Sequence, residues 1–378
     1  MATKTGEEKR ALPGAELFAD AALCASLLAR LEAELDRPLR FMEVCGTHTV
    51  SLFRSGLHSL LPAGVVHLSG PGCPVCVTHD REIAACLTLA GKEGVTVATF
   101  GDLLRVPGPG GGSLKEAKAA GAEVEVVYSP LDSLDLARKR PERTVVFLGA
   151  GFETTAPAVA AAVLLAKKSG LGNFAVLSLH KLVPPALEAL LAEEGAPGLD
   201  ALLLPGHVST ILGLAPYRFL AERHKIPGVV GGFEPADILH SLLLMLDMRR
   251  TGLAEIRNQY TRAVPEEGNP RAREILFSVF EPADALWRGL ESIPASGLIM
   301  RREYGDFDAW RRFSLVLPES PPVRGCRCGD VLRGRIAPAA CPLFAAACTP
   351  ASPVGPCMVS TEGSCAAHFL YREGREER

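Results

Sequence analysis

The sequence has no excess of positive charge and no long run of apolar residues. Lysine and arginine number 40 against 43 aspartate and glutamate residues, which gives a formal net charge of -3 over 378 residues. Such a chain has no basic field to attract nucleic acid or anionic lipid, so we expect neither a nucleic-acid partner nor a membrane. No stretch approaches the roughly 18 apolar residues of a membrane span. The charged start, MATKTGEEKR, lacks the apolar core of a signal peptide. We therefore expect a cytoplasmic protein.

Cysteine is absent from the middle of the chain. None of the eleven cysteines lies between Cys86 and Cys326. Because the reducing cytoplasm disfavours structural disulfides, cysteines grouped near both ends indicate metal ligation or thiol chemistry. The early group contains Cys45, Cys73 and Cys76, and the late group contains Cys326, Cys328, Cys341, Cys348, Cys357 and Cys365.

The order of apolar and amphipathic segments predicts an α/β fold. After a helix expected around Ala15 to Leu35, apolar runs such as RFMEV alternate with amphipathic runs such as TVSLFRSGLHSLL. This alternation is typical of βα units around a parallel sheet. It resumes after Pro141 with TVVFLGA and APAVAAAVLLAKK. We therefore predict two doubly wound parallel-sheet domains, over residues 1–140 and 141–261.

The last third of the chain has a different pattern. From about Arg262 the sequence becomes rich in proline and arginine, loses its periodicity and ends in the late cysteine group. Residues 262–378 are therefore predicted to form a smaller C-terminal domain whose shape depends on a metal.

The loop MEVCGTHT is the first candidate site. Cys45 follows a predicted strand and stands at a predicted helix N-terminus, where free N–H groups and the helix dipole lower a thiol pKa. Cys45 is thus a candidate thiolate ligand or nucleophile, with His48 as base, second ligand or hydrogen-bond partner. The alternative interpretation is a small buried cysteine beside a capping threonine.

The loop SGPGCPVCVTHD is the second candidate site. Its Cys-x-x-Cys pair, Cys73 and Cys76, can form a reversible disulfide or supply half of a tetrahedral metal site. The prolines and glycines of this loop favour a pre-set dithiol, so we favour a redox role. A zinc site completed by His79 and Cys45 is the competing interpretation.

Two further strand ends carry polar residues. The loop LGAGFETTAP resembles a weak Gly-x-Gly turn, but it lacks the third glycine of a dinucleotide-binding fingerprint. Glu153 and Thr154 are instead candidates for proton-transfer or hydrogen-bonding groups facing a cleft between domains. His207, in LPGHVST, occupies a similar position, although a single histidine in such a turn is more often structural.

The late cysteines form the strongest signal. The segments CRCGDVLRG, CPLFAAAC and GPCMVSTEGSC hold six cysteines within forty residues, which core packing does not explain. Two zinc ions would need about eight ligands, whereas one 4Fe-4S cluster takes four cysteines and leaves a thiol pair beside it. The spacing alone does not decide which four bind.

These motifs together resemble a known family. FMEVCGTHT, SGPGCPVCV, GFETTAP, CRCGDVLRG, CPLF, CTP and GPCMVSTEGSCAAH are similar, in order, to the motifs of the HypD family of hydrogenase maturation factors. The resemblance implies two α/β domains and a third domain with a 4Fe-4S cluster. The family spacing Cys-x14-Cys-x6-Cys-x16-Cys then corresponds here to Cys326, Cys341, Cys348 and Cys365.

The resemblance also implies roles for the other cysteines. Cys328 and Cys357 correspond to a thiol pair beside the cluster, as in ferredoxin-thioredoxin reductase, and Cys73 and Cys76 to a second redox pair. Cys45 corresponds to the family's ligand for the iron of an Fe(CN)2CO centre, with His48 and Thr49 positioning the iron ligands or a proton donor.

The family resemblance implies partners as well. A small HypC-type protein supplies a second cysteine to the iron, and HypF and HypE make a thiocyanate that delivers cyanide. The hydrogenase large subunit is then met transiently through the HypC-type protein. The residues alone leave two other functions open, a stand-alone iron-sulfur disulfide reductase and a structural zinc protein.

Overall fold

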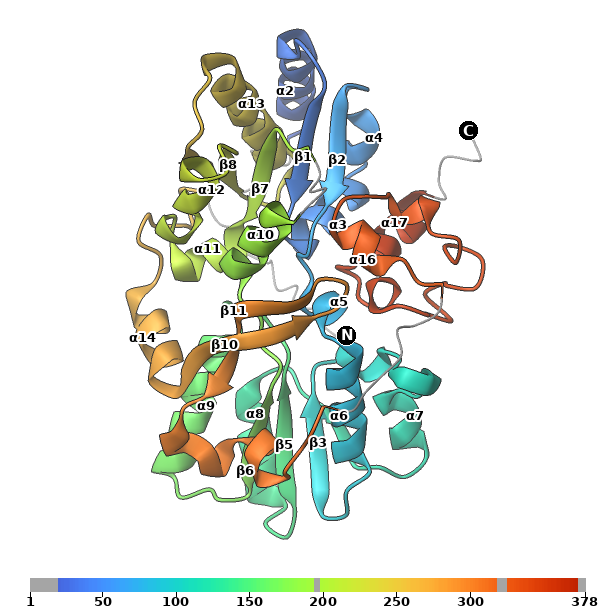
Figure 1. The fold of residues 1–378 in the computed structure, drawn as a ribbon, viewed down its shortest axis with the longest axis vertical. Coiled ribbons are helices and arrows are strands. Elements are labelled where there is room, and N and C mark those ends of the chain that lie inside the picture. The colour runs from blue at the N-terminus through green and yellow to red at the C-terminus, as the bar shows by residue number, and fades with distance from the viewer. Residues whose placement is uncertain (1–19, 194–197, 318–324, 373–378) are drawn as a thin grey trace, which may run out of the picture.

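The computed structural model describes residues 20–193, 198–317 and 325–372 (Figure 1). The first helix, α2 (Ala21–Glu34), begins after Asp20, whose carboxylate accepts hydrogen bonds from the backbone N–H groups of Ala22 and Leu23. A side-chain acceptor at this position satisfies amide groups that have no partner within the helix. Residues 15–19 of the predicted helix lie outside the described residues.

The upper sheet in Figure 1 is parallel and has the strand order β2, β1, β7, β8, β9. Its strands are β1 (Leu39–Glu43), β2 (Val65–Ser69), β7 (Ala201–Pro205), β8 (Gly228–Gly231) and β9 (Ile256–Asn258). The strand β7, ALLLP, is buried along its whole length, as expected of a strand covered on both faces. The helices near this sheet are α3 (Gly46–Arg54), α4 (Leu57–Leu60), α10 (Val183–Ala192), α11 (Gly206–Leu212), α12 (Arg218–Glu222) and α13 (Pro235–Thr251), with η3 (Ala215–Tyr217).

The lower sheet is also parallel, with the strand order β4, β3, β5, β6. Its strands are β3 (Val95–Thr99), β4 (Val124–Val126), β5 (Thr144–Gly149) and β6 (Phe174–Ser178). One face packs on α9, where Val159 and Val163 contact the core around Phe147, and the other packs on α6, which contributes Ile83 and Leu89. The neighbouring elements are α6 (Asp80–Ala90), α7 (Leu114–Ala119), α8 (Pro130–Lys139) and α9 (Ala156–Lys168), with η1 (Leu103–Arg105) and η2 (Pro109–Gly111). The prediction of two parallel α/β sheets is therefore confirmed.

The predicted boundary at residue 140 does not fall between the two sheets. β3 and β5 lie on either side of this boundary in the sequence, yet they pair directly through Val97 and Val146. β1 and β7 lie on either side of it too, and they pair through Met42 and Leu202. The ranges 1–140 and 141–261 thus each contribute strands to both sheets, because the chain passes from the upper sheet to the lower and back again. The βα alternation of the sequence does not indicate where the chain passes from one sheet to the other.

Most of the region after residue 262 packs on the lower sheet or between the two sheets. The helix α14 packs against α9, and an antiparallel hairpin of β10 and β11 crosses the middle of the molecule (Figure 1). The buried indole of Trp287 on this hairpin stacks on Phe152, with ring centroids 6.1 Å apart. The elements are α14 (Pro270–Val279), β10 (Phe280–Trp287), β11 (Glu291–Met300), η4 (Arg302–Phe307) and α15 (Ala309–Arg312). The hairpin was not predicted from the sequence.

The late cysteines lie in a compact segment of short helices, drawn in red at the right of Figure 1. Its elements are α16 (Cys328–Leu332), η5 (Pro338–Ala340), η6 (Pro356–Met358) and α17 (Ser364–Arg372). This cysteine segment packs against α3 through α17 and against the short helix α5 (Pro74–Val77) through η6. It therefore contacts both early cysteine loops.

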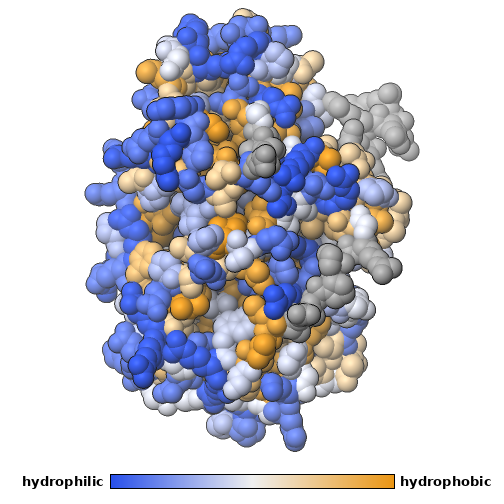
Figure 2. Space-filling model, viewed as in Figure 1, coloured by the Kyte–Doolittle hydropathy of each residue, from blue (hydrophilic) through white to orange (hydrophobic). Residues whose placement is uncertain are grey.

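The carboxyl ends of both sheets meet in the middle of the molecule. Val44 follows β1 and Phe152 follows β5, and both belong to one buried cluster with Cys73 and Cys76. In open α/β sheets, ligands bind where the strand order reverses, which here is between β1 and β7 and between β3 and β5. On the face shown in Figure 2, hydrophobic residues are grouped mainly across this middle region. None of the helices in the described ranges combines the length and apolar character needed to cross a bilayer.

Replacing Phe147 with alanine is expected to destabilise the lower sheet. The ring is fully buried at the centre of β5 and makes an edge contact with Phe100. Loss of such a ring costs about 3–5 kcal/mol of unfolding free energy, measured by urea denaturation followed by circular dichroism. The exposed Leu131→Ala is the control, with an expected change within about 0.5 kcal/mol. Equal urea midpoints for the two variants would contradict this assignment of the core.

Candidate functional site

Cys45 lies two residues after the end of β1 and occupies the N-cap position of α3, without a capping hydrogen bond from its side chain. Its backbone N–H donates to a carboxylate oxygen of Glu43 over 2.8 Å, and the other oxygen of Glu43 accepts from the Thr49 hydroxyl over 2.5 Å. Glu43 is itself buried at the end of the strand. The loop is thus fixed by a buried carboxylate placed next to the thiol.

The environment of Cys45 does not lower its pKa, contrary to the prediction. Burial raises the pKa of the thiol to about 12, and the carboxylates of Glu362 and Glu43 add to this effect. The backbone N–H groups of Thr47 and His48 act in the predicted direction, but their effect is smaller. Desolvation of the charged form therefore outweighs the helix N-terminus. Without a cation beside it, Cys45 is a neutral thiol at pH 7.

His48 is buried and held by the end of β8. Its Nε2 lies 2.9 Å from the carbonyl oxygen of Gly232 and 3.2 Å from that of Gly231. Two carbonyl acceptors fix the proton on Nε2 and leave Nδ1 as a buried acceptor without a partner. Burial lowers the pKa of His48 to about 4, so the ring is neutral at pH 7. His48 therefore anchors the Cys45 helix to the end of β8.

His207 lies on the other side of the same switch point. The rings of His48 and His207 both contact Phe233, with centroids 4.7 and 4.0 Å from the Phe233 centroid. His207 is exposed overall, and the burial of part of its ring lowers its pKa. The structure thus brings these two predicted residues to one aromatic ring.

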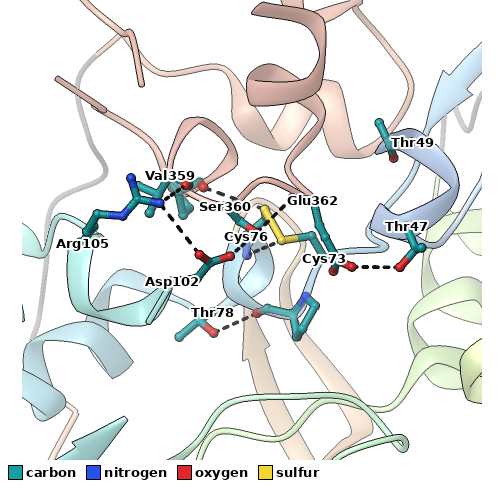
Figure 3. Close-up of a disulfide and its surroundings, with 12 residues drawn as sticks. Thr47, Thr49, Cys73, Cys76, Thr78, Asp102, Arg105, Val359, Ser360 and Glu362 are labelled. Carbon is teal, nitrogen blue, oxygen red and sulfur yellow. Dashed lines mark hydrogen bonds and ion pairs between the residues drawn. A yellow bond between two sulfur atoms is a disulfide. The ribbon is translucent and has the colours of Figure 1, made fainter. Parts of the chain in front are cut away.

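Glu362 connects the cysteine segment to the Cys45 loop (Figure 3). Its carboxylate accepts a hydrogen bond from the Thr47 hydroxyl over 2.8 Å. A Cβ at Gly46 would lie 2.6 Å from the backbone oxygen of Glu362, so only glycine permits this approach. Burial raises the pKa of Glu362, and the nearby carboxylate of Asp102 reinforces this. The site therefore receives a second acidic group from the far end of the chain.

Cys73 and Cys76 form a disulfide next to the Cys45 loop (Figure 3). Pro74 starts the short helix α5 between them, and the Gly72 carbonyl accepts from the Gly46 N–H over 2.9 Å. This pairing agrees with the predicted redox pair. The imidazole of His79, a ligand in the competing zinc interpretation, caps α6 by accepting a hydrogen bond at Nδ1 from the Arg81 N–H.

All six late cysteines line a single small cavity of about 20 Å³. The same wall includes Leu343, Phe344 and Met358, so the sulfur atoms face an otherwise apolar space. A Cβ at Gly355 would lie 2.8 Å from the sulfur of Cys326, so a larger side chain would displace that sulfur. Six sulfur atoms around one space fit a multi-iron cluster with a thiol pair beside it.

The sulfur cavity does not resemble a zinc site. Across the described ranges, no three His, Cys, Asp or Glu side chains are placed to hold a single metal ion. The ligands of a 4Fe-4S cluster each bind a different iron, so they surround the cluster and need not converge on one point. The cavity lining includes the four cysteines of the family spacing, so its donor set is compatible with a cluster.

A buried arginine, Arg288, affects the pKa of both Cys328 and Cys357, which we call the inner thiol pair. The Arg288 guanidinium is 4% exposed and forms an ion pair with Asp80 over 2.5 Å. A hydrogen bond from the Cys326 thiol and the charge of Arg288 lower the pKa of Cys328 to about 6. Burial raises the pKa of Cys357, although Arg288 partly offsets it. The two thiols of the pair are therefore electrostatically unequal.

Glu153 lies in the middle of the molecule, but Thr154 is exposed. One carboxylate oxygen of Glu153 accepts from the Val183 N–H at the start of α10, and the other has no hydrogen-bond partner. Burial raises the pKa of Glu153 to about 7. The negative charge of Glu153 also contributes to the raised pKa of buried Tyr217, so the two side chains are neighbours. Only Glu153 of this predicted pair is therefore placed to hold a proton in the core.

Several residues of the site were not predicted. Glu43 could have been found, because a charged residue two positions before Cys45 interrupts an apolar strand. Glu362 stands among cysteines in STEGSC, which is a weaker signal. Nothing near Arg288 or Tyr217 in the sequence marks them, since the fold brings them to the site from distant hairpin and helix positions.

Comparison with known proteins gives one consistent result. A family model described as "HypD: Hydrogenase formation hypA family" matches residues 22–372. A hydrogenase maturation factor HypD of Rhodobacter capsulatus is 45% identical over 95% of this chain and 98% of its own length. Proteins described in the same words from Rhizobium leguminosarum bv. viciae and Escherichia coli (strain K12) are each 43% identical, over 95% and 92% of this chain and 96% and 93% of their own lengths.

Replacing Glu153 with glutamine is expected to change the pH dependence of stability. The folded pKa is raised from 4.5 to about 7, so the stability that the neutral carboxyl confers is complete below pH 4.5 and is lost as the pH rises through 7. Between pH 5 and pH 8, Glu153→Gln should therefore gain about 2–3 kcal/mol relative to the unchanged protein. Urea denaturation at the two pH values measures this. The exposed Glu142→Gln is the control, and parallel stability curves for Glu153→Gln and the unchanged protein would refute the buried neutral carboxyl.

Proposed function

The chain belongs to the HypD family of hydrogenase maturation factors, and we propose that it is the scaffold on which the Fe(CN)2CO centre of NiFe-hydrogenases is assembled. In this proposal Cys45 holds the iron, which is the cargo, and cytoplasmic partners deliver its ligands. Electrons come from a resident 4Fe-4S cluster through two thiol pairs.

A continuous chain of contacts between the three cysteine sites carries this proposal. The Cys45 loop touches the disulfide loop through the Gly46–Gly72 hydrogen bond. The disulfide in turn touches the sulfur cavity, since the sulfur of Cys76 lies 3.8 Å from the carbonyl oxygen of Pro356, next to Cys357. Three sites with separate metal or redox chemistry would have no need of such proximity.

The charges around Cys45 support iron binding there. The carboxylates of Glu43 and Glu362 disfavour a bare thiolate but favour a metal cation at the same place. When iron(II) binds, the Cys45 thiol releases its proton, and the soft anionic sulfur suits an iron that also carries cyanide and CO. His48, which is neutral and held through Nε2, orients the loop in this proposal.

The sulfur cavity would hold the cluster. Following the family spacing, we assign Cys326, Cys341, Cys348 and Cys365 as its ligands, and the cavity contains all four. A bound cluster would supply single electrons to the neighbouring pair of Cys328 and Cys357. That pair would reduce the disulfide of Cys73 and Cys76 by dithiol–disulfide exchange.

A pocket of about 360 Å³ beside the Cys45 loop offers room for a partner. Thr47, Arg54, Phe233 and Glu362 are part of its lining, so it opens onto the carboxylate side of the site. We propose that the N-terminal cysteine of a HypC-type protein enters here and supplies the second thiolate to the iron. HypE would then deliver cyanide to this complex, and the HypC-type protein would pass the iron centre to the hydrogenase large subunit.

A stand-alone disulfide reductase is the second candidate. It would use the cluster and both thiol pairs in the same way, but it would need neither a partner nor iron at Cys45. The buried carboxylates beside Cys45 favour the scaffold, because a thiol–disulfide enzyme gains nothing from disfavouring a thiolate there.

Replacing Cys45 with alanine is expected to abolish iron-centre binding and to leave the cluster intact. The protein would be purified anaerobically with its HypC-type partner and studied by visible absorption and infrared spectroscopy. Brown cluster absorption should persist, whereas the cyanide and CO stretching bands should disappear.

Cys86→Ala is the matched control, because Cys86 is also buried but packs in the lower-sheet core, away from the site. It should retain both signals. If the unchanged protein has cluster absorption but no cyanide or CO bands, the scaffold fails and the reductase is the better account.

Single serine substitutions are expected to separate cluster ligands from the thiol pair. Serine at position 326, 341, 348 or 365 should lower iron and sulfide content by about half or more, since each removes one of four ligands. Serine at position 328 or 357 should retain the cluster and abolish reduction of the Cys73–Cys76 disulfide. Cluster loss at 328 or 357 instead would overturn the ligand assignment, and colourless protein with bound zinc would overturn the cluster.

A further inference from the structure

The tip of the β10–β11 hairpin contacts the backbone next to both thiol pairs. Its residues Trp287, Arg288 and Gly289 contact the segment that follows Cys76 on one side and the segment that follows Cys328 on the other. We call these three residues the hairpin tip. The cysteine spacings and the proposed relay both leave its role unassigned.

On the disulfide side, the hairpin tip pairs with the backbone after Cys76. The N–H of Arg288 donates to the carbonyl of Val77 over 2.9 Å, and Trp287 forms an antiparallel bridge with Thr78. Val77 is the residue next to Cys76 and is fully buried. The position of Cys76 is therefore tied to the hairpin through the backbone, with no flexible side chain between them.

On the cavity side, the hairpin tip meets the backbone after Cys328. A Cβ at Gly289 would lie 2.4 Å from the Cα of Gly329, and a Cβ at Gly329 would lie 3.0 Å from the Cα of Gly289. Two glycines therefore pack backbone to backbone, at a distance that side chains do not permit. Gly329 is the residue next to Cys328, so this contact sets how closely Cys328 approaches the hairpin.

A buried ion pair of Arg288 holds the hairpin tip in place. Its guanidinium pairs with Asp80 in the first turn of α6, and both side chains are buried. Removing one member of a buried ion pair leaves an uncompensated charge, so the pair resists separation. Trp287 adds a hydrogen bond from its indole N–H to the Ser296 hydroxyl over 2.8 Å. The hairpin tip is thus rigid where it touches both loops.

We propose that the hairpin tip is a spacer that sets the separation between the Cys328–Cys357 pair and the Cys73–Cys76 disulfide for direct exchange. This inference rests on the proposed relay. In the exchange, one thiolate of the inner pair attacks a sulfur of the Cys73–Cys76 disulfide and forms a mixed disulfide. The second thiol of the inner pair then attacks the sulfur of its partner in the mixed disulfide and releases the bound cysteine. This leaves Cys328–Cys357 as a disulfide and Cys73 and Cys76 as thiols. Two electrons and two protons move from one pair to the other, and misplacement of about 1 Å slows such a step by up to about a hundredfold.

The test widens the spacer by one methyl group. Gly289→Ala has a matched control in Gly110→Ala, because both glycines have a positive φ, 76° and 81°, but a Cβ at Gly110 would meet nothing within 4 Å. Each full-length, cluster-loaded variant is reduced anaerobically with dithionite. Samples are then denatured in N-ethylmaleimide, and labelling at Cys73 and Cys76 is followed by peptide mass spectrometry.

Gly289→Ala should slow the labelling of Cys73 and Cys76 by about tenfold or more, with cluster absorption unchanged, while Gly110→Ala keeps the original rate. Gly329→Ala widens the same contact from the other side by a smaller amount and should slow labelling in the same direction. If Gly289→Ala does not fold, the labelling rate of Gly329→Ala tests the spacer in its place.

The outcomes separate the spacer from the relay. Labelling of Gly289→Ala and Gly329→Ala at the unchanged rate, with intact clusters, would overturn the spacer and leave the relay in place. If the unchanged protein itself shows no labelling of Cys73 and Cys76 after reduction, the relay fails and the spacer fails with it. Arg288→Lys, which keeps the charge, should recover most of the rate that Arg288→Met loses, and equal rates for the two would contradict the role of the ion pair.

Discussion

The site depends on the close approach of the Gly72 backbone to the backbone of Cys45. A Cβ at Gly72 would lie 2.2 Å from the Cys45 nitrogen, so any other residue would push the two loops apart. The loops come from different strands of one sheet, and their contact places the disulfide beside the thiol that we assign to iron. Glycine is therefore required here by space, whatever the conformational preference of the loop.

Burial and negative charge act together at this site. A thiol that is desolvated and flanked by Glu43 and Glu362 stays protonated until a cation enters. The electrostatics at Cys328 are different, because a hydrogen bond from the Cys326 thiol and the charge of Arg288 lower the pKa of Cys328. Burial thus favours the neutral thiol at Cys45, whereas a hydrogen bond and a guanidinium favour the thiolate at Cys328.

The sequence predicted local structure better than it predicted arrangement. The helix α9 has the predicted bounds, because its alanine-rich periodicity lies between a proline and a lysine pair. The passage of the chain from one sheet to the other was not predictable. β5 is a buried apolar strand, and such a strand fits either sheet equally well. The expectation that loops after neighbouring strands meet at one edge of a sheet placed the Cys45 loop near the loop of Cys73 and Cys76, and the two loops are in contact. The pKa of Cys45 is raised mainly by burial and further by Glu362, which is more than three hundred residues away in the sequence, and no local sequence pattern indicates either effect.

The passage of the chain between the sheets has a consequence for synthesis on the ribosome. The lower sheet, from β3 to β6, is continuous in sequence and has all its strands once residue 178 has emerged. The upper sheet begins with β1 and β2, but these strands gain their neighbour β7 only after residue 205 (Figure 1). Because a chain emerges from the ribosome N-terminus first, all strands of the lower sheet are available before β1 and β2 gain their neighbour in the upper sheet. The contact that ties the Cys45 loop to the cysteine segment needs Glu362, so it forms only after residue 362 has emerged.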